Sequence, residues 1–205
     1  MEVEAILLAQ AKTGENNLKL FLLSREKGYT YAYKKIGKKL SNKALPDLFD
    51  TAILNLEIGY QGKVFFIKDY TILKRRDKIP QEYHRFHTAC RLTKLISING
   101  IWLEDTHHTY RLTEQSLDAL NNGGNSDVIY LKSLYLLIRH EGYPVKEAWQ
   151  QTLSSIHRKN LRYYLSQPLE KLDKIPAQNV SPIIQSLEDW TRYETSLQIS
   201  DLAKD

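Results

Sequence analysis

The hydrophobic pattern of this chain changes its period at Pro80, and that change limits the folds that the chain can adopt. Before Pro80, short runs of residues alternate between apolar and polar side chains, which is typical of β-strands. After Pro80, apolar residues recur every three to four positions, which is typical of amphipathic helices. The sequence therefore predicts an all-β domain over residues 1–79 and an all-α domain over residues 80–205.

Five short strands separated by turn residues are expected in the first domain. They cover Val3–Lys12, Leu18–Ser24, Tyr29–Tyr33, Thr51–Gly59 and Val64–Ile72. One long connection, Lys34–Asp50, interrupts the series between the third strand and the fourth. A five-stranded closed barrel with a long connection at that place is the pattern of an OB-fold. The fold class we expect is α+β, with an N-terminal OB-fold barrel followed by helices.

Helical periodicity and end signals predict five helices in the second domain. They cover Gln81–Ile98, Thr113–Asn121, Val128–Glu141, Lys146–Tyr164 and Pro182 to about Ser196. The third of these helices is apolar on nearly every side, which indicates that it is buried among the others. Asp127 is expected to cap it.

The composition supports a folded protein with a mild preference for acidic partners. The chain has 205 residues, of which 42% are hydrophobic and 26% charged, and its net charge is +5. The single cysteine, Cys90, excludes an intrachain disulfide and a zinc site built on several cysteines. The first residues do not resemble a signal peptide, and no apolar run is long enough to cross a bilayer of about 30 Å. We therefore expect a soluble, cytoplasmic protein with no membrane partner.

The stretch YTYAYKKIGKKLSNK, residues 29–43, is the best candidate for a DNA-binding site. Alternation places Tyr29, Tyr31 and Tyr33 on one face of a strand, where exposed rings can stack on bases. The lysines that follow, with no acid among them, can neutralise phosphates. They are Lys34, Lys35, Lys38, Lys39 and Lys43. The alternatives are a solvated loop and rings that fill the barrel, and Tyr33 is the favoured stacking residue.

Further basic residues extend the candidate DNA-binding site. Lys74, Arg75, Arg76 and Lys78 follow the last strand, and Arg25 lies in the turn after the second strand. The first group can also be an ordinary charged linker. Arg158, Lys159 and Arg162 form a weaker candidate in the fourth helix.

The sequence gives little support to a metal site or to catalysis. His84, His87 and Cys90 are spaced three residues apart, so a helix would turn them progressively away from one metal ion. The chain has no nucleophile elbow, no phosphate-binding lysine motif and no zinc-protease motif. We therefore expect a protein that is not an enzyme and that needs no cofactor.

Five segments of the chain, in order, resemble the bacterial RecO family of recombination mediators. They are EAILLAQ, LFLLSREKG, YKKIGKKLSNK, LNLEIGYQGKVFFIKDYTIL and YLKSLYLLIRHEGYPV. The resemblance covers roughly residues 2–145. Many members of the family carry a four-cysteine zinc module soon after the glycine turn, whereas this chain has no cysteine there.

The resemblance implies a protein that binds single- and double-stranded DNA and anneals complementary strands. It also implies RecR and the single-strand binding protein as partners in loading the RecA recombinase onto coated DNA during recombinational repair. Such a protein would be bacterial and associated with the nucleoid. The alternative function is a protein-interaction adaptor whose OB-fold does not bind DNA tightly.

A partner site is expected in the helical domain. Its candidate residues are Leu134, Leu137, Ile138, Tyr143 and Trp149. They can form a groove for the short acidic and hydrophobic tail that the resemblance assigns to single-strand binding protein. The alternative is that they form the core of the helical domain.

Overall fold

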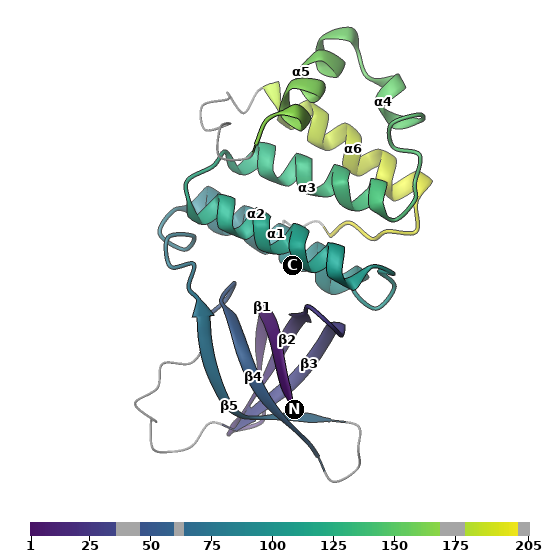
Figure 1. Ribbon diagram of the computed structural model, residues 1–205. Coiled ribbons are helices and arrows are strands. Elements are labelled where there is room, and N and C mark those ends of the chain that lie inside the picture. The colour runs from purple at the N-terminus through teal and green to yellow at the C-terminus, as the bar shows by residue number, and fades with distance from the viewer. Residues whose placement is uncertain (36–45, 60–63, 169–178, 201–205) are drawn as a thin grey trace. The chain divides into compact units, whose positions relative to one another are not determined.

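The computed structural model describes residues 1–35, 46–59, 64–168 and 179–200, which fall into two compact units (Figure 1). The first, the barrel unit, comprises Met1–Arg76 and Gly100–Arg111. The second, the helical unit, comprises Asp77–Asn99 and Leu112–Asp205. Both units are discontinuous in the sequence, because residues 100–111 group with the barrel strands while the residues on either side of them group with the helices.

The barrel unit is a closed sheet of five strands, and it confirms the expected OB-fold. The strands are β1 (Glu2–Thr13), β2 (Asn17–Ser24), β3 (Gly28–Lys35), β4 (Thr51–Ile58) and β5 (Phe65–Lys74). Their order around the barrel is β1-β2-β3-β5-β4, and β4 closes onto β1. Only the contact between β3 and β5 is parallel. The barrel closes between β3 and β5 at two register pairs, Ala32 with Phe65 and Tyr33 with Phe66.

Alternation along each strand separates the interior of the barrel from its outer face. On β2, Leu18, Leu20 and Leu22 are buried in the interior, and on β3 the small Ala32 faces them. Burying a leucine side chain contributes about 1.5–3 kcal/mol, so this inward row is a main source of stability for the barrel. The residues between them in the sequence point outward.

The end of the long connection is fixed by an unusual backbone conformation at Phe49. Its φ angle is 73°, a left-handed value that costs a non-glycine residue about 1–2 kcal/mol. The Phe49 amide donates to the carbonyl oxygen of Leu7 at 2.8 Å, and its own carbonyl accepts from the guanidinium of Arg76. Arg76 also donates to Thr51 Oγ1 at 3.0 Å. These bonds hold the start of β4 against β1.

The turn between β2 and β3 needs a glycine at position 28. Gly28 has a φ of +67°, and a Cβ atom there would come within 2.5 Å of Thr106 Cγ2. Both residues belong to the barrel unit. Thr106 therefore packs closely on this turn.

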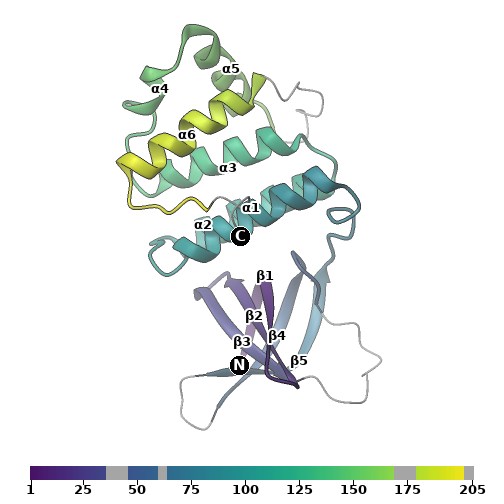
Figure 2. The same cartoon turned by 180° about the vertical axis from the view of Figure 1, so that it is seen from behind.

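The helical unit packs its helices around α3. The helices are α1 (Tyr83–Asn99), α2 (Thr106–Asn121), α3 (Ser126–His140), α4 (Trp149–Thr152), α5 (Ser155–Ser166) and α6 (Ser181–Glu194). The first residues of α2 belong to the barrel unit. Figure 2 shows α3 and α6 side by side, as Figure 1 does from the other side. Most residues of α3 are buried, as its all-round apolar sequence predicts.

Three local expectations for the helices are wrong, each because a capping residue sets the boundary. The helix α2 begins at Thr106 rather than Thr113, since Asp105 accepts the amide of His108 at 2.8 Å. The N-cap of α3 is Asn125, whose side chain accepts the Val128 amide at 3.1 Å. It is not Asp127, which lies inside the first turn.

The third difference is that the expected helix Lys146–Tyr164 is broken into α4 and α5. Leu153 has extended backbone angles and ends α4. Ser154 then accepts the His157 amide at 3.3 Å and starts α5. A serine N-cap thus outweighs continuous apolar periodicity.

A buried polar network joins α1, α3 and α6. Glu188 Oε1 accepts from Arg91 Nη2 at 2.8 Å and from the Tyr130 hydroxyl at 2.6 Å. The Arg91 guanidinium also lies 3.7 Å from the centroid of the Tyr130 ring. Burial raises the pKa of Tyr130, so its hydroxyl stays protonated and donates.

Within the described residues, no helix has the length and hydropathy that a membrane span requires.

Candidate nucleic-acid interface

Four aromatic side chains lie next to one another on the outer face of the barrel, across three strands. We call Phe21 of β2, Tyr31 and Tyr33 of β3, and Phe66 of β5 the aromatic strip. Phe21 pairs with Tyr31 across β2 and β3, and Tyr33 pairs with Phe66 across β3 and β5. Tyr31 and Phe66 are exposed, at 38% and 41% of their surface. The rings therefore do not fill the barrel, whose interior is aliphatic at these positions.

Three rings of the strip, those of Tyr31, Tyr33 and Phe66, contact one another in turn. The centroids of Tyr31 and Tyr33 are 5.9 Å apart with the planes at 89°, an edge-to-face arrangement. Those of Tyr33 and Phe66 are 6.0 Å apart and tilted by 38°. Such contacts contribute about 0.5–1.5 kcal/mol each and fix the ring orientations. The strip is thus a preformed surface.

Lys19 adds a positive charge to the strip. Its Nζ atom lies 4.0 Å from the ring centroid of Tyr31 and 4.9 Å from that of Phe21. Lys19 is paired with Tyr33 in the register of β2 and β3, so it stands on the same outer face. A cation held over exposed rings is suited to a ligand that carries both bases and phosphates.

Gly59 sets the position of Phe66. The Gly59 amide donates to the carbonyl oxygen of Val64 at 2.8 Å, which brings the two chain segments together. A Cβ atom on Gly59 would lie 2.9 Å from Phe66 Cε2. The absence of a side chain at position 59 therefore lets the Phe66 ring lie close to the backbone.

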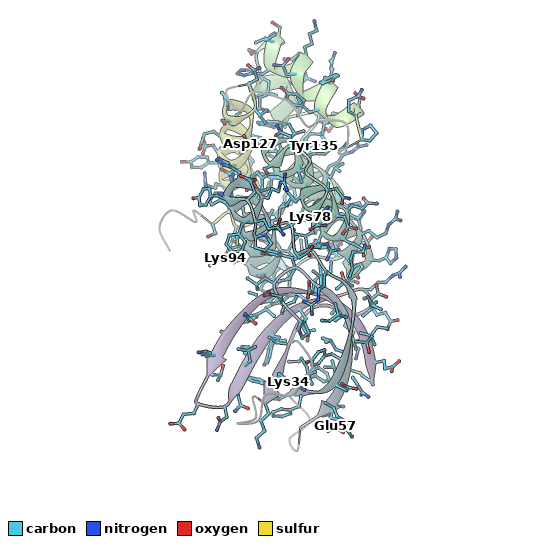
Figure 3. All side chains as sticks on the ribbon, turned by 90° about the vertical axis from the view of Figure 1, so that its left-hand side faces the viewer. Lys34, Glu57, Lys78, Lys94, Asp127 and Tyr135 are labelled. Carbon is cyan, nitrogen blue, oxygen red and sulfur yellow. The ribbon has the colours of Figure 1, made fainter. Side chains whose placement is uncertain are left out.

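Lys34, the first lysine of the predicted loop, makes its contacts within the barrel unit. Its Nζ atom donates to the carbonyl oxygens of Ile67 and Lys68, each at 3.2 Å, and lies 5.3 Å from the centroid of the Tyr70 ring (Figure 3). Lys34 thereby links β3 to β5. Lys35 is exposed at the end of β3. The other predicted lysines, Lys38, Lys39 and Lys43, lie outside the described residues.

The second basic cluster divides into surface and buried residues. Lys74 and Lys78 are exposed. Arg75 forms an ion pair with Asp50 at 3.1 Å, in which the Asp50 side chain is only 3% exposed. Arg76 is 2% exposed and donates to the Phe49 carbonyl, so its guanidinium holds the backbone and is not on the surface.

Arg25, the last of the predicted DNA-binding residues, is exposed in the turn between β2 and β3. Its backbone amide donates to the carbonyl oxygen of Glu4 at 3.2 Å. The side chain remains at the surface, and the structure gives it no place in the aromatic strip.

Sequence reasoning missed three members of this surface: Lys19, Phe21 and Phe66. The alternation of β2 contains the signal for two of them, since Lys19 and Phe21 fall between the buried leucines. Phe66 could not be found in this way, because its place beside Tyr33 depends on the parallel pairing of β3 with β5.

The residues of the predicted partner groove belong to the core of the helical unit. Leu134 and Ile138 have no exposed surface, and Leu137 and Trp149 have 1% each. Trp149 Nε1 donates to Ser186 Oγ on α6 at 3.1 Å. Tyr143 is half-buried, and its hydroxyl lies 2.6 Å from Ser196 Oγ. The four buried residues therefore line no open groove.

His84, His87 and Cys90, the residues weighed for a metal site, belong to α1 of the helical unit. Tyr83 and His87 stack with centroids 5.8 Å apart. Burial lowers the pKa of His87 and raises the pKa of the Cys90 thiol. Within the part of the chain that the structure describes, no group of three His, Cys, Asp or Glu residues could hold a metal ion.

The fold and the strip together define an OB-fold barrel with an outer aromatic face, joined to a helical unit. No protein-family model matches the chain, and none of the curated proteins matches it significantly. The resemblance to the RecO family rests on the sequence segments quoted above and stays a prediction.

Proposed function

We propose that the protein binds single-stranded DNA along the aromatic strip of its barrel and acts as a recombination mediator. The observation that carries this proposal is the row of three contacting rings, Tyr31, Tyr33 and Phe66, on an outer face, two of them more than a third exposed. OB-fold proteins bind single strands by stacking bases on such rings. Rings buried in the barrel interior could not stack on bases.

The chemistry of the strip suits binding without sequence preference. Each stacked base contributes about 1–3 kcal/mol, and every base has a face that can stack. Lys19 and Lys35 supply positive charge near the phosphates, and lysine contacts position a backbone without identifying bases. The neighbouring Lys68 is paired with Glu57 at 2.6 Å and adds no net charge.

As a mediator, the protein would anneal complementary strands and help to load recombinase on DNA that is coated with single-strand binding protein. It is supported by the order of barrel and helices and by the five segments that resemble the RecO family. RecR and the single-strand binding protein are the proposed partners, and the proposed setting is the bacterial cytoplasm at the nucleoid. No catalytic step is proposed.

A fluorescence anisotropy titration with a labelled oligothymidine of about 20 nucleotides tests the binding surface. We expect saturable binding that weakens as salt rises, because phosphate contacts release counterions. The double variant Tyr31→Ala, Phe66→Ala should bind at least about tenfold more weakly. Tyr193→Ala is the matched control, since Tyr193 is 85% exposed and belongs to the helical unit.

Annealing of two complementary oligonucleotides tests the mediator role. We expect the protein to accelerate annealing and the double variant not to do so. Absence of both DNA binding and annealing, together with a partner protein that co-purifies, would show that the adaptor function is correct instead.

A further inference from the structure

A basic pocket of about 410 Å³ lies in the helical unit, between α3, α4 and α5. This volume is within the range of about 300–1,000 Å³ that small-molecule sites occupy. Its residues come from all three helices and from the turn after α3. The pocket is separate in the sequence from every residue of the aromatic strip.

Three cations line the pocket, and no carboxylate of the described residues does. Arg139 comes from α3, Lys146 from the turn that follows α3, and Arg162 from α5. All three are exposed, and within the described part of the chain none of them has an ion-pair partner. The charge of Glu147 acts on Tyr135, but Glu147 itself does not line the pocket. The described lining of the pocket therefore carries a net positive charge, which favours an anion.

Apolar and neutral polar groups complete the lining. Leu136 and Leu165 are half-buried and provide apolar surface. Tyr135 and Gln150 are 3% and 7% exposed. Burial raises the pKa of Tyr135, which keeps its hydroxyl neutral and able to donate. The pocket thus combines charge with apolar surface and hydrogen-bonding groups, as ligand sites do.

We propose that this basic pocket binds a nucleoside phosphomonoester, either as a free mononucleotide or as the phosphorylated end of a strand. A phosphomonoester carries a charge of about −1.5 to −2 at neutral pH, so it balances three cations better than a carboxylate does. Arginine side chains match phosphate oxygens with two parallel hydrogen bonds. The base can lie against Leu136 and Leu165, with the amide of Gln150 available to its polar edge.

Calorimetric titration of the full chain with adenosine 5′-monophosphate tests the proposal. We expect one saturable site, with adenosine and inorganic phosphate each at least about tenfold weaker. The double variant Arg139→Gln, Arg162→Gln should lose at least about tenfold in affinity for the mononucleotide. Lys159→Gln is the matched control, because Lys159 is exposed on α5 and does not line the pocket. A second variant, Lys146→Gln, changes the turn rather than a helix and should also weaken binding.

Oligonucleotides with and without a 5′-phosphate identify the source of the ligand. A preference for the phosphorylated strand that disappears in the double variant identifies a strand end, and binding of the mononucleotide alone identifies a free nucleotide. The variant Tyr31→Ala should weaken binding of both oligonucleotides by the same factor and leave the ratio between them and the affinity for the mononucleotide unchanged, which separates this proposal from DNA binding by the barrel.

Four results would overturn the proposal. The first is the absence of saturable mononucleotide binding together with the absence of a preference for the 5′-phosphate. The second is equal affinity for inorganic phosphate and the mononucleotide, and the third is an equal loss of affinity in Lys159→Gln and in the double variant. The fourth is binding of a peptide carboxylate without binding of a nucleotide. Circular dichroism of each variant confirms that it is folded.

Discussion

The ammonium nitrogen of Lys19 lies 4.0 Å from the ring centroid of Tyr31, directly above an exposed aromatic ring. The two residues lie on neighbouring strands, and the diagonal between them spans the register of β2 and β3. This contact keeps the lysine at the surface of the strip, where it can attract a phosphate while the rings attract bases.

Replacing Tyr31 with alanine should weaken single-stranded DNA binding by about tenfold, since one stacked base contributes about 1–3 kcal/mol. Anisotropy titrations give the affinity, and thermal unfolding should change little because the ring is exposed. An unchanged affinity would remove Tyr31 from the binding surface.

Replacing Lys19 with glutamine should act differently from Tyr31→Ala. It removes one positive charge, so the slope of log affinity against log salt should fall by about 0.7 for a single strand. Salt titrations of the two variants give this comparison. Equal slopes in the wild type and Lys19→Gln would show that Lys19 contacts no phosphate.

Replacing Gly59 with alanine should displace the ring of Phe66, because the new Cβ would lie 2.9 Å from its Cε2 atom. We expect weaker DNA binding with the barrel still folded, since the ring is at the surface and can move. The combination of Gly59→Ala with Phe66→Ala is the control. If Gly59 acts through Phe66, adding Gly59→Ala to Phe66→Ala should cost little further affinity.

Replacing Lys34 with methionine should lower the free energy of unfolding by about 1–2 kcal/mol, because two hydrogen bonds to β5 carbonyl oxygens are lost. Lys35→Met is the matched control, with an exposed side chain and an expected change within about 0.5 kcal/mol. Urea unfolding gives both values. A larger loss for Lys35→Met would contradict the structural role of Lys34.

Replacing Arg76 with glutamine should destabilise the protein by about 2–3 kcal/mol, because the buried Phe49 carbonyl and Thr51 hydroxyl lose their donor. DNA binding by the folded fraction should not change, since Arg76 is buried. A variant with unchanged stability and weakened DNA binding would contradict this structural role and support the sequence-based prediction that Arg76 binds DNA.

The OB-fold could be predicted because each strand carries its own alternation and each turn its own glycine or polar residues. The face of the tyrosines could be predicted only as a pair of alternatives. Ala32 decides between them, because a small inward residue leaves room for the leucines of β2 and turns the tyrosines outward. That choice depends on the residues across the barrel, which a single strand does not encode.

The candidate site was harder to predict because its parts come together through long-range pairing. Tyr33 and Phe66 meet only where β3 and β5 run parallel. In the same way, the basic run after β5 gave no sign that Arg76 turns inward to the Phe49 carbonyl. For Leu134, the apolar sequence of α3 was compatible with a partner groove and with the core, and its burial agrees with the core.

The network around Glu188 gives the helical unit a dependence on its last helix. Glu188 is the acceptor for Arg91, which lies 97 residues earlier in the chain, and for the hydroxyl of Tyr130. Until α6 has been synthesised, Arg91 and Tyr130 lack this carboxylate, and a buried hydroxyl such as that of Tyr130 costs about 1–3 kcal/mol when its partner is missing. We therefore expect α1 and α3 to pack stably only after Glu188 has left the ribosome.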